Sequence, residues 1–223
     1  MTTVPDDIKA WRKLRRTELL AQREAVPLDV RRGWNAQVTR LLIEGFSVLD
    51  RCIIGFCWPF KGEADARFFI HHMRQRGATA ALPAVVEKKG PLQFREWWPG
   101  VEMEAGVFDL PVPKATRVLL PDALLIPPVG FGQRGYRLGY GGGYFDRTLG
   151  AMAPQPIKIA VAFEVSRMPT IYPQPHDVPM DFIVTERGIH RVIDEALVLI
   201  DEPNEVSAQV TQLMRERGLP LRT

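Results

Sequence analysis

Apolar residues near the N-terminus recur at helical spacing, and farther along the chain the spacing changes to short continuous runs. The first stretch predicts a helix over residues 6–26 that Asp6 or Asp7 caps. A second helix is predicted from Pro27 to a stop at Gly45. Its apolar stripe consists of Trp34, Val38, Leu41 and Leu42. These two helices make up the N-terminal part of the predicted fold.

The next part of the chain predicts a parallel strand–helix–strand unit. Residues 52–58 and 78–85 are apolar runs typical of strands buried on both faces, and residues 64–77 between them have helical spacing. Residues 92–98 predict a more exposed strand. Residues 99–113 are rich in Gly and Pro, and we expect an ordered loop there.

The second half of the chain repeats the alternation of strand and helix. It predicts strands over 123–131, 157–163 and 181–186, and helices over 144–152 and about 204–217. No internal repeat or low-complexity linker interrupts the pattern. We therefore expect one α/β domain over residues 1–223, a three-layer αβα sandwich with a mostly parallel central sheet, Rossmann-like in form.

Composition excludes several classes of protein. With 46% hydrophobic and 25% charged residues, the chain resembles an ordinary globular protein. A net charge of +3 is too balanced to indicate a nucleic-acid binder. No secretory leader and no apolar run of about 18 residues is present, so we expect a cytoplasmic protein with no membrane partner.

Cys52 and Cys57 would point to opposite faces of a strand, which predicts two free thiols. No heptad pattern is evident, and we expect a monomer.

The most informative segment is a glycine-rich loop with five glycines in nine residues, Gly135–Gly143, between a buried strand and a helix. Glycine allows positive φ and close approach of a ligand to the amides, which makes such a turn an anion site. Arg134 and Arg137 could pair with phosphates, and Asp146 could bind Mg²⁺. The spacing is neither a Walker A loop nor a Rossmann fingerprint. From the residues alone, a simple glycine-rich connector remains an alternative.

The segment GYRLGYGGGYFDRTL resembles the signature of the 5-formyltetrahydrofolate cyclo-ligase family, whose pattern is roughly G-x-R-L-G-x-G-x-G-Y-[YF]-D. The matching positions are Gly135, Arg137, Leu138, Gly139, Gly141, Gly143, Tyr144, Phe145 and Asp146. The resemblance covers about residues 9–190. It implies the conversion of 5-formyltetrahydrofolate to 5,10-methenyltetrahydrofolate, in which ATP and Mg²⁺ phosphorylate the formyl oxygen before N10 closes the ring. Small-molecule folate and ATP are the implied partners.

The resemblance also implies roles for individual residues. Arg137 and Tyr144 would be catalytic, and Asp146 and Asp181 would hold Mg²⁺. ATP would be bound by Arg12, Arg16, Arg134, Arg137, Leu138, Gly139, Tyr140, Gly141, Gly142, Gly143, Tyr144 and Phe145. The folate would be bound by Trp58, Glu63, Tyr140 and Tyr144. Arg12, Arg16 and Arg23 fit the register of the basic N-terminal helix of the family.

For several of these residues a purely structural role remains open. The basic residues of the first helix could form a solvated face. Glu63 could be a carboxylate that offsets a helix dipole. His176 and Asp177, which match the family's H-D pair, could form a structural turn.

Three positions depart from the family pattern. Val112 stands where Glu is usual, Ser166 where Gln is usual and Gly132 where Asp is usual. These departures keep two alternatives open: an ATP-dependent ligase or kinase that acts on another substrate, and a non-catalytic folate- or nucleotide-binding protein.

Overall fold

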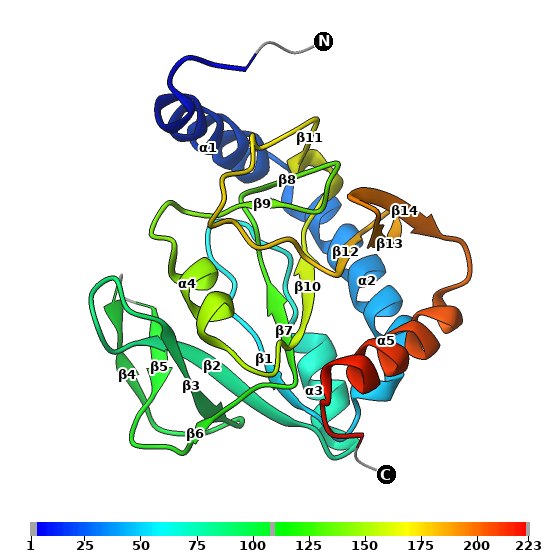
Figure 1. Cartoon of the computed structure of the whole chain (residues 1–223). Coiled ribbons are helices and arrows are strands. Elements are labelled where there is room, and N and C mark those ends of the chain that lie inside the picture. Colours follow the sequence, from blue (N-terminus) through cyan, green and yellow to red (C-terminus); the bar gives the residue numbers. More distant parts are fainter. Residues whose placement is uncertain (1–3, 108–109, 222–223) are drawn as a thin grey trace.

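The core of the structure is a nine-stranded sheet in the order β14-β13-β12-β10-β7-β1-β2-β3-β6 (Figure 1). The computed structural model describes residues 4–107 and 110–221. The five central strands run parallel to one another: β12 (Phe182–Thr185), β10 (Ile157–Val161), β7 (Ala123–Ile126), β1 (Ile53–Gly55) and β2 (Thr79–Val85). Antiparallel strands extend both margins: β13 (Gly188–Ile193) and β14 (Ala196–Ile200) on one side, β3 (Leu92–Trp97) and β6 (Val118–Leu119) on the other.

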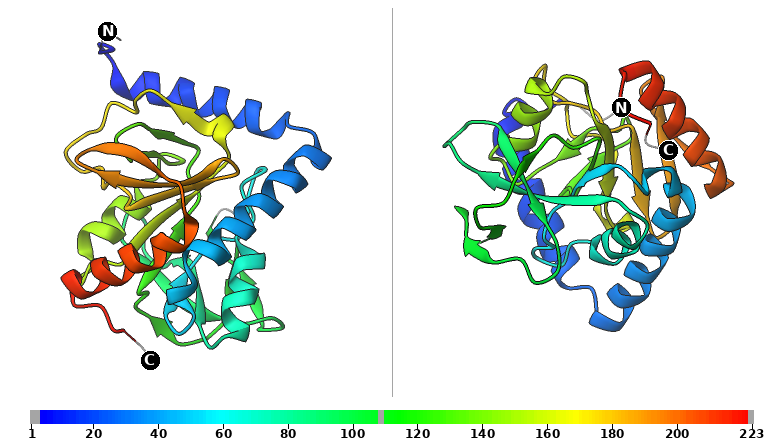
Figure 2. Two further views of the ribbon diagram at one scale, coloured as in Figure 1. Left: turned by 90° about the vertical axis from the view of Figure 1, so that its right-hand side faces the viewer. Right: turned by 90° about the horizontal axis from the view of Figure 1, so that it is seen from below.

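The central strands are apolar because helices cover both faces of the sheet. Every residue of β7 and β10 is buried, as expected for parallel strands between two layers. One face packs against α2 (Leu28–Gly45), α3 (Arg67–Gln75) and α5 (Pro203–Arg217), and the other against α4 (Tyr144–Ala151). Figure 2 shows these two groups of helices on opposite sides of the sheet. The predicted three-layer α/β fold is thereby confirmed.

A smaller sheet lies at one end of the molecule, beneath the first helix. Its strands are β11 (Arg167–Met168), β8 (Gly130–Gly132) and β9 (Arg137–Leu138), in that order. Helix α1 (Ile8–Glu24) crosses this sheet, and Leu19 packs there with Val129, Leu138 and Met168 (Figure 1). The first helix therefore rests on loops and small strands rather than on the main sheet.

Most predicted elements agree with the structure. The first helix is capped by Asp7, whose carboxylate accepts a hydrogen bond from the Ala10 amide at 2.9 Å. The second helix begins after Pro27 and includes Gly45 as its last residue. The last helix ends before Gly218, which adopts a left-handed conformation. Short 3-10 turns follow at η1 (Ser47–Leu49) and η3 (Glu164–Ser166).

The structure differs from the expected elements in three places. Residues 99–113 contain a hairpin, β4 (Met103–Ala105) with β5 (Pro111–Pro113), rather than only a loop. The strand predicted over 123–131 is two strands, because Pro127 and Pro128 cannot donate to a sheet. The β13–β14 hairpin was not predicted, since its turn uses Asp194 and Glu195 at positive φ instead of glycine.

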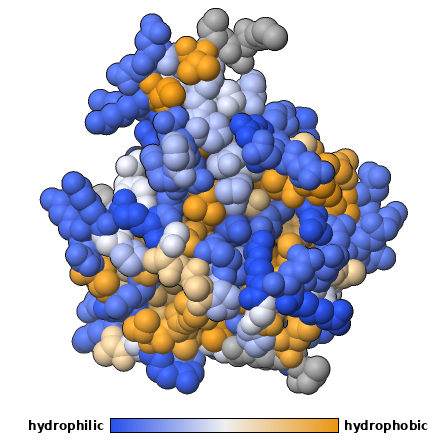
Figure 3. Space-filling model, in the orientation of Figure 1, coloured by the Kyte–Doolittle hydropathy of each residue, from blue (hydrophilic) through white to orange (hydrophobic). Residues whose placement is uncertain are grey.

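The surface carries apolar residues over the β13–β14 hairpin, visible as a patch in Figure 3, where Ile193, Val198 and Leu199 are exposed. In the described ranges, no helix has the length and apolar character needed to cross a bilayer. Neither Cys52 nor Cys57 forms a disulfide.

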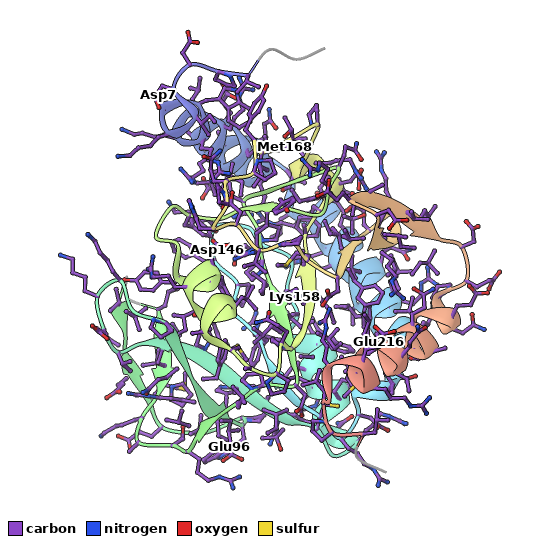
Figure 4. The ribbon with its side chains drawn as sticks, viewed as in Figure 1. Asp7, Glu96, Asp146, Lys158, Met168 and Glu216 are labelled. Atoms are coloured by element: carbon purple, nitrogen blue, oxygen red, sulfur yellow. The ribbon has the colours of Figure 1, made fainter. Side chains whose placement is uncertain are left out.

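The end of α5 is fixed to the main sheet by one acidic residue. Arg217 donates to both carboxylate oxygens of Asp181 at 2.8 and 2.7 Å, and the Lys158 ammonium lies 3.2 Å from the same carboxylate. Figure 4 shows Lys158 on β10, within the sheet. Because these side chains are largely buried, the ion pairs act in a partly desolvated setting.

We expect Asp181→Asn to lower the free energy of unfolding by about 2–3 kcal/mol, because charge-assisted hydrogen bonds are lost and two cations keep no counter-charge. Urea denaturation measures the change. Glu44→Gln, which breaks the exposed Arg40–Glu44 pair, is the matched control and should cost at most about 0.5 kcal/mol. Equal effects of the two substitutions would contradict this account of α5.

Candidate active site

A cavity of about 490 Å³ lies at the carboxyl ends of the central strands, where ligands of parallel sheets commonly bind. The glycine-rich loop and the start of α4 form one wall. The segment after β1, the end of β2 and the β4–β5 hairpin form the others. Its lining residues are Cys57, Trp58, Phe60, Lys61, Glu63, Leu82, Pro83, Val85, Leu92, Val107, Leu110, Pro111, Val112, Ile126, Pro127, Arg137, Gly139, Tyr140, Gly142, Gly143, Tyr144, Phe145 and Asp146.

The glycine-rich loop leaves a row of amides available for a ligand. Gly141 and Gly143 adopt φ of 98° and 65°, and Gly143 is the N-cap of α4. Such angles favour glycine. Within the described parts of the chain, the N–H groups of residues 140–143 donate to no protein acceptor. The loop is instead held by its carbonyls: Arg16 donates to Gly139 at 2.6 Å and Arg147 to Gly142 at 2.7 Å. Free amides at a helix N-terminus form an anion site.

Arg137 and Asp146 form a buried pair beside this loop. The Arg137 guanidinium donates to Asp146 Oδ1 and to the Val178 carbonyl, both at 2.8 Å. Burial lowers the pKa of Arg137, and the adjacent Asp146 opposes this change. Asp146 lies in the first turn of α4, at the end that faces the small sheet (Figure 4). Its other oxygen, Oδ2, accepts no hydrogen bond from the described residues, so it can still bind a cation or a donor.

A second polar cluster surrounds Glu63, which also lines the cavity. The Tyr140 hydroxyl donates to Glu63 Oε1 at 2.6 Å, and the Phe60 amide donates to Oε2 at 2.9 Å. Burial raises the pKa of Glu63 to about 7, although Tyr140, Arg23 and the Phe60 amide favour its charged form. The Phe60 and Tyr140 rings lie 6.0 Å apart in this cluster. Burial also raises the pKa of the Tyr140 hydroxyl.

The structure brings most of the predicted site residues to the cavity. The predicted residues that line it are Trp58, Glu63, Arg137, Gly139, Tyr140, Gly142, Gly143, Tyr144, Phe145 and Asp146. Arg16 lies behind the loop, against Gly139 and Gly141. Leu138 is buried beneath α1 and does not line the cavity, although its neighbours Arg137 and Gly139 do.

Three further predicted residues, Arg12, Arg134 and Asp181, are bound elsewhere in the structure. Arg12 donates to the Ile171 and Tyr172 carbonyls and pairs with Asp177. Arg134 pairs with Glu195 at the surface. Asp181 was expected to share a metal with Asp146. It instead precedes β12 at the amino ends of the strands, and both of its oxygens are bound by Arg217 and Lys158.

The resemblance assigned no role in the site to two arginines that lie there. Arg23 follows Arg12 and Arg16 in the pattern of basic residues along α1. It is buried, and its guanidinium donates to the Tyr140 hydroxyl at 2.8 Å. Arg147 directly follows Asp146, and its guanidinium lies 5.0 Å from the Tyr144 ring centre. The family's pattern of basic residues in the first helix already included Arg23. The position of Arg147 next to the glycine-rich loop could have indicated its place in the site.

Of the three departures from the family pattern, only Val112 lines the cavity. Ser166 is buried at the end of η3, and Gly132 belongs to β8 in the small sheet.

A second, open depression of about 530 Å³ lies near η3. Its Glu164 and Arg167 pair with each other, and Thr185 donates to the same carboxylate. Charges neutralised in this way leave little for a charged ligand, in contrast to the free amides of the first cavity.

Comparison with known proteins agrees with this geometry. The sequence profile of the 5-formyltetrahydrofolate cyclo-ligase family matches residues 8–186, which include α1, the glycine-rich loop and both polar clusters. The chain belongs to this family. A 5-formyltetrahydrofolate cyclo-ligase from Mycolicibacterium smegmatis is 32% identical over 183 residues, which cover 78% of this chain and 93% of the relative.

Two solved structures share the fold of this cyclo-ligase family member. A 5,10-methenyltetrahydrofolate synthetase from Aquifex aeolicus superposes with a TM-score of 0.72 at 24% identity, covering 82% of this chain and 93% of the other. The corresponding enzyme from Mycoplasma pneumoniae gives 0.65 at 23% identity, covering 78% and 98%. At these identities the likeness supports the fold, and function rests on the site.

The raised pKa of Glu63 predicts a pH-dependent stability. Its pKa is 4.5 when unperturbed and about 7 in the folded protein, so between these values the folded state holds a proton that the unfolded chain releases. Stability therefore falls as the pH rises through this range, by up to about 2–3 kcal/mol. Relative to wild type, Glu63→Gln should lose this decline, measured by urea denaturation at pH 4.5 and pH 8. Parallel pH dependences of the two proteins would contradict the prediction.

Proposed function

We propose that this protein catalyses the ATP- and Mg²⁺-dependent cyclisation of 5-formyltetrahydrofolate to 5,10-methenyltetrahydrofolate, with release of ADP and phosphate. The observation that carries the proposal is a single cavity that holds two polar clusters of different chemistry, which we assign to two ends. One end offers free loop amides, Arg137 and Asp146, and the other offers aromatic and apolar walls with Glu63. A triphosphate fits the first end, and a flat, mostly apolar ring system fits the second.

The phosphate end has the donors that phosphoryl transfer requires. The amides of residues 140–143 and the first turn of α4 would hold phosphate oxygens. Arg137 is catalytic in this proposal, because its guanidinium can stabilise the charge that develops on the transferred group. Arg16 supports the loop through Gly139. Arg12 and Arg134 are left out of the ATP site, since both are bound elsewhere.

The folate end would hold the ring system between aromatic surfaces. Trp58 lines this wall under the Arg67 guanidinium, at 4.8 Å from its ring centre. Tyr140 and Tyr144 lie at the junction of the two ends, so they can contact both substrates. Glu63 would accept hydrogen bonds from ring nitrogens. This arrangement supports a folate as the substrate rather than a smaller carboxylic acid.

The residues at the phosphate end fit Mg²⁺. Mg²⁺ is held by one or two carboxylates together with phosphate oxygens and water, and Asp146 Oδ2 is open to the cavity. No group of three acidic, His or Cys residues suited to a metal occurs in the ranges 4–107 and 110–221, which fits an ion held mainly by ATP. Bound there, the ion would neutralise charge on the phosphates.

The reaction needs no protein nucleophile. The formyl oxygen attacks the γ-phosphorus, the bond to ADP breaks, and the N5 lone pair forms a double bond to the formyl carbon. N10 then adds to that carbon, the carbon–oxygen bond breaks with release of phosphate, and the N10 proton is lost. The chain's own residues contribute by aligning the two substrates and excluding water. We propose that the enzyme is a monomer. We propose the cytoplasm as its location.

A spectroscopic assay tests the proposed reaction. We expect the absorbance of the methenyl product to rise only when 5-formyltetrahydrofolate, ATP and Mg²⁺ are all present, because phosphorylation of the formyl oxygen precedes ring closure. Each component is omitted in turn, with ADP release followed in parallel. ATP hydrolysis independent of the folate would favour a ligase or kinase for another substrate. Folate binding without turnover would favour a binding protein.

The metal assignment makes a separate prediction. Asp146→Asn should raise the Mg²⁺ concentration needed for half-maximal turnover by about tenfold, equivalent to about 1.4 kcal/mol, because the open carboxylate oxygen is lost. Asp181→Asn is the matched control and should leave the Mg²⁺ titration unchanged. If the control shifted the titration and Asp146→Asn did not, the two assignments would have to be exchanged.

A further inference from the structure

Arg23 has an unusual position for a helix arginine, since its side chain is only 3% exposed. Its guanidinium donates to the Lys61 carbonyl and the Pro128 carbonyl, each at 3.0 Å, and to the Tyr140 hydroxyl at 2.8 Å. One side chain of α1 thus connects the segment after β1, the segment after β7 and the glycine-rich loop. Residues of all three segments line the cavity.

The contact with Tyr140 determines toward which partner the Tyr140 hydroxyl hydrogen points. Arginine can only donate, so the Tyr140 oxygen must accept from Arg23. The single hydroxyl hydrogen is then left for Glu63, whose Oε1 lies 2.6 Å away. The Arg23 guanidinium also lies 3.9 Å from Glu63 Oε1. Arg23 therefore acts on the Glu63 carboxylate in two ways, through Tyr140 and through its own charge.

The other groups near Glu63 do not supply a comparable charge. Cys57 has its pKa raised by burial and by Glu63, so its thiol is neutral. Lys61 lies over the Phe60 ring at 5.3 Å. Arg31 of α2 approaches the backbone at Gly62. Among the described residues, Arg23 is the cation paired with this carboxylate.

Resting on the function proposed above, we propose that Arg23 is a positioning residue for the folate: it favours the ionised form of Glu63 and directs the Tyr140 hydroxyl toward it, so that Glu63 presents an acceptor to the substrate. It is not a catalytic residue, because it does not line the cavity. The raised pKa of Glu63, about 7 even with Arg23 present, supports the need for such a partner.

The pH profile of kcat/KM for 5-formyltetrahydrofolate tests this role. In wild type the acid limb should lie near the Glu63 pKa of about 7. In Arg23→Met it should move up by about one pH unit, because the compensating charge is gone. The KM for the folate at pH 7 should rise about tenfold, while the KM for ATP changes less than about twofold. Arg23→Lys keeps the positive charge but has fewer hydrogen-bond donors. The pH of its acid limb should therefore return closer to the wild-type value than its KM for the folate does.

Arg15→Met is the matched control on the same helix, where Arg15 forms an exposed pair with Glu18. It should change neither the limb nor the folate KM. Folding of each variant is checked by circular dichroism and thermal unfolding. A folded Arg23→Met with reduced kcat but an unmoved acid limb would overturn the proposal and leave Arg23 a purely structural residue.

A direct titration separates this inference from the proposed reaction. The Glu63 carboxyl carbon, labelled with ¹³C and assigned with Glu63→Gln, is titrated by NMR in wild type and in Arg23→Met. We expect the higher pKa in the variant, and equal values would refute the role of Arg23. If wild type formed no methenyl product, the proposed function would fail, and this titration would still decide the Arg23 assignment.

Discussion

The hydrogen bonds from arginines of α1 to main-chain carbonyls hold the cavity together. Arg12 binds the segment at Ile171, Arg16 binds Gly139, and Arg23 binds the carbonyls of Lys61 and Pro128. These acceptors lie in loops, and loops gain few contacts of their own to offset the entropy of ordering them. Guanidinium groups suit this task because several donors in one rigid plane reach different segments at once. The geometry of the site therefore depends on a helix that contributes nothing to the main sheet.

With the loop carbonyls engaged in this way, the loop amides are free to face the cavity. A backbone that donates its N–H groups internally could not offer them to an anion, and glycines at positive φ make the inverted orientation possible without strain. Asp146 offsets part of the Arg137 charge, and the amide dipoles and the start of α4 add to the anion site. Such fixed dipoles need little reorganisation when charge develops on a phosphate.

The sequence predicted the features that depend on residues close together in the chain, and missed the contacts between residues far apart in the chain. Caps, apolar stripes and the glycine-rich loop are local patterns, and they predicted α1, α2, α4 and most residues of the cavity wall. The partners of Arg12, Arg134 and Asp181 lie far along the chain, at Asp177, Glu195 and Arg217, and no local pattern shows such pairings. The β13–β14 hairpin was missed because its turn uses Asp194 and Glu195 instead of the usual Asn-Gly.

The departures from the family pattern have unequal consequences because they lie in different layers. Ser166 and Gly132 lie in and beside the small sheet beneath α1, away from the lining, whereas Val112 forms part of the hairpin wall. With valine at that position, Glu63 and Asp146 are the carboxylates among the described lining residues. Valine adds apolar surface to the hairpin wall, so the Val112 departure leaves both polar clusters of the cavity in place.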